Sequence, residues 1–327
     1  MTLSSLYVMP FLLKPGDFPC LSALHQFSTI SRSSTMDNHG LLRQTILLLA
    51  ALAPWVCWET YPGSGNYEFS PDRHASWMRS RQALELFSGC PTSGRAVTIG
   101  CWAQGIRATP IDVLNDLNDQ TFNMLTNRGF CHAWKSMLGM ENGSLMWAGP
   151  PCKSWVWTSR SVSKRSRTNL YGDDSREFVR DGNAFAAILA EMVRVAFLLG
   201  IFFVIEQPKS SLMFNHPLLK SALEATGAIK IYVEMWVWGG RSTKGMFLYG
   251  TAPWLRELRA HYKVLRQTNA HMLENLEKLT TTDSRGKVCG RKQELTESAA
   301  YPSAFGHCIG RMHAETWGHM AEADNAQ

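Results

Sequence analysis

The sequence predicts an α/β fold in which helices cover both faces of one sheet. Residues 82–87 form a short apolar run that stops at small residues and leads into a second pattern, as at the start of α/β nucleotide folds. Residues 144–148 form another candidate for a buried strand, which is followed by Gly149 and a pair of prolines. Residues 183–199 have helical periodicity and lead through Gly200 to an apolar strand at 201–205.

Length and composition are those of a packed globular protein. The chain has 327 residues, which suits one large domain or two modest ones. Hydrophobic residues make up 45% and charged residues 18%, below the usual ~25%, so a disordered tail and a charged coiled coil are excluded. The net charge of +6 permits nucleic-acid binding without requiring it.

The basic excess is concentrated in two segments. Residues 152–180 contain seven basic and three acidic side chains. Residues 256–292 contain nine basic and four acidic side chains. Such runs are either solvated loops or surfaces that meet a phosphate backbone.

The eight cysteines are predicted to be reduced thiols in an intracellular compartment. They form no CxxC pair, and their spacing is unlike that of a zinc ribbon or finger. The C-terminal group His307, Cys308, His313 and His319 also matches no common ligand pattern, so no metal site is predicted. The nucleus is the favoured location, with organelle targeting by the N-terminal extension as the alternative.

Four segments are predicted along the chain. Residues 1–76 form an N-terminal extension and linker, 77–254 the core, 255–295 a short basic insertion, and 296–327 a segment that returns to the core. The extension is either a targeting or anchoring segment, or a tail with one apolar helix packed on the domain. Its apolar run at 46–58 has 13 residues, fewer than the ~17 that cross a bilayer, so no stable membrane span is expected.

The turn after the first strand is a candidate cofactor site. Ser88 and Gly89 are followed by residues 91–94, Pro-Thr-Ser-Gly; glycine allows close approach of a ligand, and a helix N-terminus offers free N–H groups. The second predicted strand, 108–113, carries Asp112, an acid suited to ribose hydroxyls. The alternative for Asp112 is a helix cap or surface acid, and Asp116 and Asp119 compete for the same role.

The strand at 144–148 ends in Gly149-Pro150-Pro151-Cys152. The prolines fix the backbone and present Cys152 at the carboxyl edge of the sheet. Beside Lys153 and a basic loop, the thiol is expected to ionise easily and act as a nucleophile. The alternative is a buried, inert cysteine.

The apolar strand at 201–205 ends in Glu206-Gln207-Pro208. A buried acid is costly unless it has a partner or a function. Because the two strands belong to one sheet, Cys152 and Glu206 are predicted to lie at the same edge.

These motifs resemble those of the cytosine-C5 methyltransferases, which use S-adenosylmethionine. Residues 84–89, Leu-Glu-Leu-Phe-Ser-Gly, are similar to the family's cofactor motif, 149–152 match its Pro-Cys motif, and 206–208 stand where the family has Glu-Asn-Val. Residues 300–309 are similar, more weakly, to the family's last motif, which returns to complete the cofactor pocket. The resemblance covers roughly residues 80–250 and 296–315. It implies a Rossmann-like methyltransferase sheet with residues 77–254 as the catalytic core.

The resemblance also implies a chemistry and a set of site residues. Cys152 attacks C6 of a cytosine that is flipped out of DNA, Glu206 holds N3 and the exocyclic amine, and C5 takes a methyl group from S-adenosylmethionine. The implied cofactor-binding residues are Phe87, Ser88, Gly89, Gly94, Asp112 and Pro150. The implied nucleic-acid contacts are Lys153, Arg160, Lys164, Arg165, Arg167, Arg241 and Lys244.

Departures from the family pattern leave two alternatives open. Residues 90–94 replace a Gly-x-Gly-Gly turn, Gln207 replaces asparagine, and residues 240–244 stand in the region of a Gln-x-Arg-x-Arg motif. About 45 residues separate Trp254 from Ala300, so a target-recognition domain is reduced or absent. The alternatives are an RNA cytosine-C5 methyltransferase and an inactive module that binds nucleic acid or cofactor.

Overall fold

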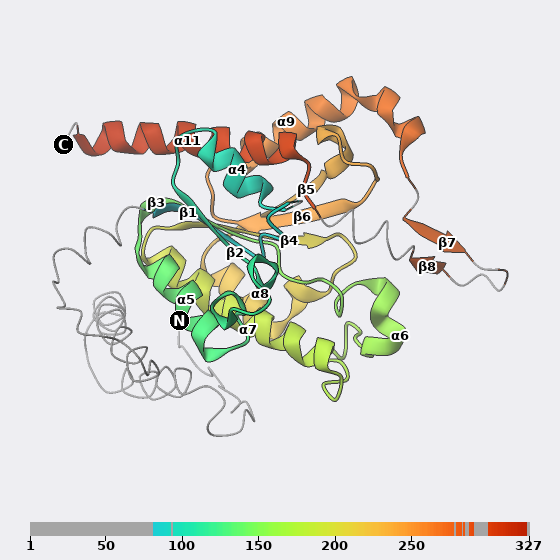
Figure 1. Ribbon diagram of the computed structural model, residues 1–327. Coiled ribbons are helices and arrows are strands. Elements are labelled where there is room, and N and C mark those ends of the chain that lie inside the picture. The colour runs from blue at the N-terminus through green and yellow to red at the C-terminus, as the bar shows by residue number, and fades with distance from the viewer. Residues whose placement is uncertain are drawn as a thin grey trace, which may run out of the picture. The chain divides into compact units, whose positions relative to one another are not determined.

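Figure 1 shows the computed structural model, which describes residues 81–92, 94–277, 279–282, 284, 288–290 and 300–325. The expectations for residues 1–76 lie outside these residues. In the part of the chain that is described, no helix combines the length and apolar character needed to cross a bilayer.

Six strands of the described chain form one mixed, mostly parallel sheet in the order β2-β1-β3-β4-β6-β5. Strands β2, β1, β3 and β4 are parallel, and β6 runs antiparallel between β4 and β5. The α/β prediction is confirmed. The strands span β1 Arg81–Leu86, β2 Ala108–Ile111, β3 Met140–Ala148, β4 Phe202–Pro208, β5 Ile229–Glu234 and β6 Gly245–Gly250.

Helices cover both faces of this sheet. Figure 1 shows α4, α9 and α11 on one face and α5, α7 and α8 on the other. Helix α7 begins six residues before the predicted 183–199 helix, because the amphipathic pattern extends back through the buried Val179. The helices span α4 Ala96–Trp102, α5 Asn127–Leu138, α7 Glu177–Leu198, α8 Pro217–Ala225, α9 Leu255–Thr268 and α11 Ser303–Asn325.

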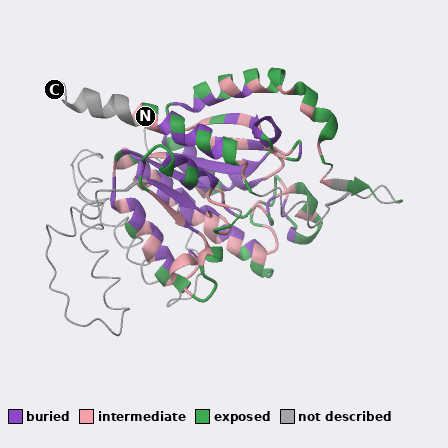
Figure 2. Ribbon diagram, turned by 45° about the horizontal axis from the view of Figure 1, so that its top comes forward, coloured by how far each residue is buried: buried purple, intermediate pink, exposed green. Residues whose placement is uncertain are grey.

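The central strands are buried along almost their whole length (Figure 2). In β4, every residue from Phe203 to Pro208 is buried, and in β3 the same holds from Ser144 to Ala148. Continuous apolar burial is typical of parallel strands that are covered on both faces. Strand β6 alternates buried and half-buried residues instead.

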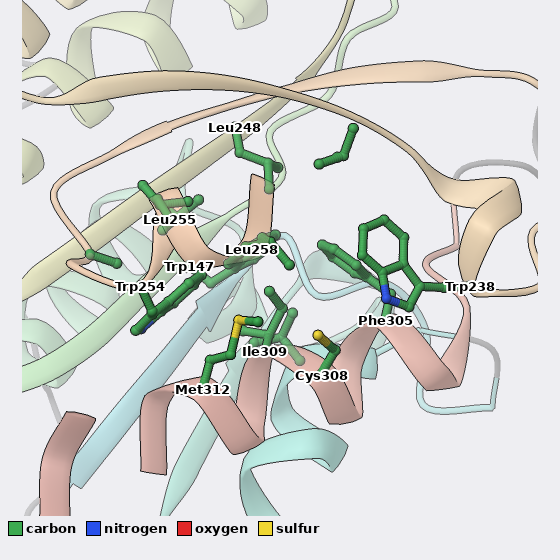
Figure 3. Packing of buried hydrophobic residues seen from close by; sticks show 14 of the residues in the cluster. Trp147, Trp238, Leu248, Trp254, Leu255, Leu258, Phe305, Cys308, Ile309 and Met312 are labelled. Carbon is green, nitrogen blue, oxygen red and sulfur yellow. The ribbon is translucent and has the colours of Figure 1, made fainter. Parts of the chain in front are cut away.

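Large rings fill the space between the sheet and helices α9 and α11 (Figure 3). Trp147 of β3 is 1% exposed and stands edge-on to Phe305 of α11, with ring centroids 5.8 Å apart. Helix α9 is the start of the predicted basic insertion, and it packs on this cluster through Leu255, Leu258 and Tyr262. The described remainder of that segment includes a short hairpin, β7 Thr280–Thr282 and β8 Val288–Gly290.

Helices α4 and α11 approach so closely that glycine is required at their contact. A Cβ atom on Gly100 would lie 1.9 Å from the carbonyl oxygen of Gly306, and one on Gly306 would lie 1.9 Å from that of Ala96. A Cβ atom on Gly310 would lie 2.2 Å from the Gly100 carbonyl oxygen. These distances are below any normal contact, so these glycines set the position of the C-terminal helix.

Replacing Gly306 by alanine is expected to lower the free energy of unfolding by up to about 2 kcal/mol. The overpacking cost in this rigid backbone contact should lie near the upper end of about 1–3 kcal/mol and is only partly offset by the ~1 kcal/mol gain in helix propensity. Chemical denaturation of the full chain measures the change. The exposed Glu315 on the same helix provides the control variant, Glu315→Ala, which should be nearly neutral. Equal stability of Gly306→Ala and the wild type would contradict the close packing.

Candidate active site

Three parallel strands end together and define one edge of the sheet. Leu86 of β1 pairs with Ala148 of β3, which pairs with Ile205 of β4. The next residues along each strand therefore bring the Phe87–Gly89 turn, the turn leading to Cys152, and Glu206 to the same edge. The structure brings together the groups that the sequence predicts there.

The turn that presents Cys152 is attached to the strand that carries Glu206. The Gln207 side chain is fully buried; its Nε2 donates to the Pro150 carbonyl oxygen at 2.7 Å, and its Oε1 accepts from Ser211 Oγ at 2.7 Å. The residue that departs from the family's asparagine thus joins the two motifs directly. Pro150 is held by this bond, and Cys152 follows as a half-buried residue.

Glu206 is a buried acid with one partnered and one unpartnered oxygen. The residue is 7% exposed, and its Oε2 accepts a hydrogen bond from the Tyr301 hydroxyl at 2.9 Å. Its Oε1 is buried without a hydrogen-bond partner among the described residues. Burial raises the pKa of Glu206, opposed by the charge of Lys244 and by the Tyr301 hydrogen bond.

The surroundings of Cys152 do not favour the easy ionisation that the sequence predicts. Burial raises the pKa of the Cys152 thiol, and the charge of Glu206 raises it further, while Lys244 acts in the opposite direction. Lys244, rather than the expected Lys153, is therefore the cation whose charge reaches both Cys152 and Glu206. Arg241, also predicted at this site, is exposed, and its carbonyl oxygen accepts from the Glu277 N–H.

The turn after β1 is sharply folded. Phe87 has a left-handed backbone with φ of 59°, and its ring stands edge-on to Phe185 at 4.9 Å. A Cβ atom on Gly94 would lie 2.4 Å from the Ser88 carbonyl oxygen, which explains the glycine there. Ser88 is 5% exposed, and its Oγ is buried without a hydrogen-bond partner in the described chain.

Asp112 binds backbone groups at the end of β2. Its Oδ2 accepts from the Gly89 N–H and its Oδ1 from the Leu114 N–H, both at 2.8 Å. This is the capping alternative, and it also ties β2 to the turn after β1. Asp116 and Asp119 cap local turns in the same way, through the N–H groups of Asn118 and Thr121.

A buried acid in β1 was missed at the sequence level. Glu85 is 2% exposed, and its Oε2 accepts from both the N–H and the Oγ1 of Thr98, at 2.7 and 2.6 Å. Helix α4 lacks a side-chain cap from its own N-cap residue, Arg95, so Glu85 supplies that cap from the sheet. Burial raises its pKa to about 7. The sequence does carry a signal for this buried acid, because Glu85 stands between two leucines of an apolar strand.

Arg165 requires a correction, because the guanidinium predicted to contact nucleic acid lies inside the protein. The residue is 2% exposed, and its guanidinium carbon stacks 3.4 Å from the centroid of the Trp155 ring. It donates to the carbonyl oxygens of Leu170 and Val179, to Asn183 Oδ1 and to Ser154 Oγ. Arg165 holds the basic loop in place, and a buried guanidinium cannot also reach a phosphate.

The other basic residues of the loop differ in their surroundings. Lys153, Lys164 and Arg167 are exposed, and the amine of Lys153 lies 5.7 Å from the centroid of the Phe178 ring. Arg160 is half-buried and its Nη2 donates to the Ser210 carbonyl oxygen at 3.4 Å. This bond ties the loop to the segment after β4.

Two further features bear on possible ligands. No group of three or more His, Cys, Asp or Glu side chains in the described residues is arranged to hold a metal ion. A cavity of about 570 Å³ is lined by residues of η5 (Met235–Trp238), α9 and α11, and none of the predicted site residues lines it.

The sequence has no match among models of known protein families. A search of curated protein sequences also finds no match.

The burial of Glu85 predicts a pH dependence of stability. Its pKa is higher in the folded chain, about 7, than the 4.5 of an unburied glutamate, so the folded state binds the proton more tightly. The free energy of unfolding should fall as pH rises from 4.5 to about 7, by about 3 kcal/mol relative to Glu85→Gln. Denaturation curves at several pH values measure it. Parallel curves for the two proteins would exclude the effect.

The Arg165 contacts predict a structural defect when the guanidinium is removed. Arg165→Met should lower the free energy of unfolding by about 3 kcal/mol, because several buried acceptors lose their donor at once, and should speed tryptic cleavage after Lys164. The exposed Arg167 gives the control, Arg167→Met. Unchanged stability combined with weaker nucleic-acid binding would instead support the phosphate contact.

Proposed function

We propose that this chain is an S-adenosylmethionine-dependent methyltransferase that modifies C5 of cytosine, with DNA as the substrate that the motifs favour. The observation that carries the proposal is the shared strand edge. There the Pro-Pro-Cys turn and the buried acid are joined by the Gln207 bond to Pro150, and the pKa of Cys152 responds to the charge of Glu206.

The strand order supports a ligand site at this edge. Strand β2 lies on one side of β1, whereas β3 and β4 lie on the other, so the chain reverses direction across the sheet between β1 and β3. Ligands of open α/β sheets bind outside the carboxyl ends of the strands at such a switch point. The turns that carry Ser88 and Cys152 flank it, which supports a Rossmann-like arrangement.

The turn after β1 has groups that suit a cofactor. Ser88 has a buried Oγ without a partner in the described chain, and Gly89 and Gly94 let the backbone of the turn fold tightly against itself. S-adenosylmethionine, when bound, supplies a methyl group activated by its sulfonium. The residues that would hold it are Phe87, Ser88, Gly89, Gly94 and Pro150, while Asp112 would act indirectly by fixing the backbone of Gly89.

Cys152 and Glu206 have complementary tasks in the proposed reaction. The deprotonated Cys152 sulfur forms a bond to C6 of cytosine, while Glu206 donates its proton to N3 and the C5–C6 electron pair becomes available at C5. After C5 takes the methyl group, a base removes the C5 proton. The bond from sulfur to C6 then breaks, its electrons leave with Cys152 as the C5–C6 double bond re-forms, and N3 returns its proton to Glu206.

The electrostatics of the site suit these tasks. Burial shifts the pKa of Glu206 upward, which favours the protonated form that a proton donor needs. The raised pKa of Cys152 means that its proton must leave when substrate binds, and the charge of Lys244 favours the thiolate. The exposed Lys153, which follows Cys152 in the chain, and the exposed Lys164 and Arg167 of the same loop would offer basic groups to a phosphate backbone.

Two substitutions test the function directly. Full-length protein is incubated with labelled S-adenosylmethionine and either duplex DNA or RNA. Wild-type protein should label DNA; Cys152→Ala should reduce transfer to background, and Glu206→Gln should reduce it by about 100-fold, as expected for loss of a proton donor. Cys131→Ala, a half-buried cysteine on α5, serves as the matched control and should retain activity.

Each other outcome selects an alternative. Label in RNA alone would replace DNA with RNA as the substrate. Cofactor binding without transfer to either nucleic acid would support a binding module. Full activity of Cys152→Ala would exclude the covalent mechanism.

A further inference from the structure

Tyr301 reaches the candidate site from the far end of the described core. It lies 95 residues after Glu206, just before α11, and its hydroxyl donates to Glu206 Oε2 at 2.9 Å. Its ring is held between two others, edge-on to Trp147 with centroids 5.9 Å apart and tilted against Phe305 at 5.6 Å. The position of this hydroxyl is therefore fixed by packing.

The direction of the hydrogen bonds around Tyr301 follows from the donors present. An indole N–H can only donate, and Trp147 Nε1 lies 3.4 Å from the Tyr301 oxygen. The Tyr301 oxygen thus accepts from Trp147, and its single proton points to Glu206. Burial and the charge of Glu206 raise the pKa of Tyr301 far above its usual value, so this proton stays on the tyrosine.

The two carboxyl oxygens of Glu206 therefore differ in their hydrogen bonding. Oε2 receives the Tyr301 proton, whereas Oε1 is buried without a partner among the described residues. In the neutral acid, the proton then belongs on Oε1, because Oε2 already accepts. Among the described residues, the charged and titratable groups that act on this acid are Lys244, Cys152 and Tyr301, and the charge of Glu85 in turn acts on Tyr301.

We propose that Tyr301 is a positioning residue, which fixes the carboxyl group of Glu206 so that Oε1 and its proton face the substrate. The inference rests on the proposed function, in which Glu206 donates a proton to the base. Through Tyr301, the C-terminal segment would take part in the reaction. The position of this segment is set by the glycine contact between α4 and α11.

Gly149 supports this role independently. A Cβ atom on Gly149 would lie 2.5 Å from the Tyr301 hydroxyl oxygen and 3.6 Å from Glu206 Oε2. Any larger residue would displace the hydroxyl from the acid. The glycine before Pro150-Pro151-Cys152 therefore leaves space for Tyr301.

Tyr301→Phe keeps the ring and removes only the hydroxyl. Since the lost hydrogen bond favours the ionised acid, the pKa of Glu206 should rise by about one pH unit. The carboxyl stretch of protonated Glu206, assigned by difference infrared spectra against Glu206→Gln, measures this shift without any turnover. Methyl transfer should show a kcat about tenfold lower, with KM for nucleic acid within twofold. Gly149→Ala should shift the pKa of Glu206 in the same direction.

Tyr262→Phe is the matched control. It also removes a tyrosine–glutamate hydrogen bond, from Tyr262 to Glu234 Oε2 at 2.9 Å, but neither residue belongs to the site. It should change neither the infrared titration nor kcat.

The infrared titration keeps the two proposals separable. A wild-type protein without methyl transfer would overturn the proposed function, and the positioning role in that reaction with it, while the titration would still report the Tyr301 contact. An unchanged pKa of Glu206 in Tyr301→Phe, an equal effect of Tyr262→Phe, or a pKa shift with unchanged kcat would overturn the positioning role alone.

Discussion

The aligned register of β1, β3 and β4 is the constraint on which the rest of the structure depends. Leu86, Ala148 and Ile205 lie side by side, so three loops begin at one edge, each within a few residues of a buried strand. A slip of one residue in a strand would turn its side chains to the opposite face. The Gln207 bond to Pro150 adds a second tie across the edge, and together they determine where Cys152 and Glu206 meet.

Burial at this edge has a cost that the neighbouring groups offset. Glu206 and Glu85 are both acids within the sheet, and burial favours the neutral form of each. Glu85 is compensated by the start of α4, through the two Thr98 donors. Glu206 has one donor, Tyr301, and retains an unpartnered oxygen. The first arrangement serves the structure, while the second leaves Oε1 of Glu206 without a partner among the described residues.

Much of the sheet could be predicted from the sequence, because periodicity and turn residues are local. The strand at 201–205 and the Pro-Pro turn were visible as a continuous apolar run and a fixed backbone. The side-chain contacts were not predictable in this way. Tyr301 meets Glu206 across 95 residues, and Arg165 belongs to a charged loop by its sequence but is enclosed by Trp155 and Asn183. Such contacts depend on packing between distant segments, which no local pattern encodes.

Covalent capture of a cytosine analogue tests the central claim most directly. Duplex DNA containing 5-fluorocytosine is incubated with full-length protein and S-adenosylmethionine, because the bound base cannot release its C5 fluorine as it would a proton. Intact-mass spectrometry and peptide mapping then locate any adduct. A DNA adduct on Cys152, absent in Cys152→Ala, is the predicted result. No adduct, or an adduct on another cysteine, would contradict the assignment of Cys152 as the nucleophile.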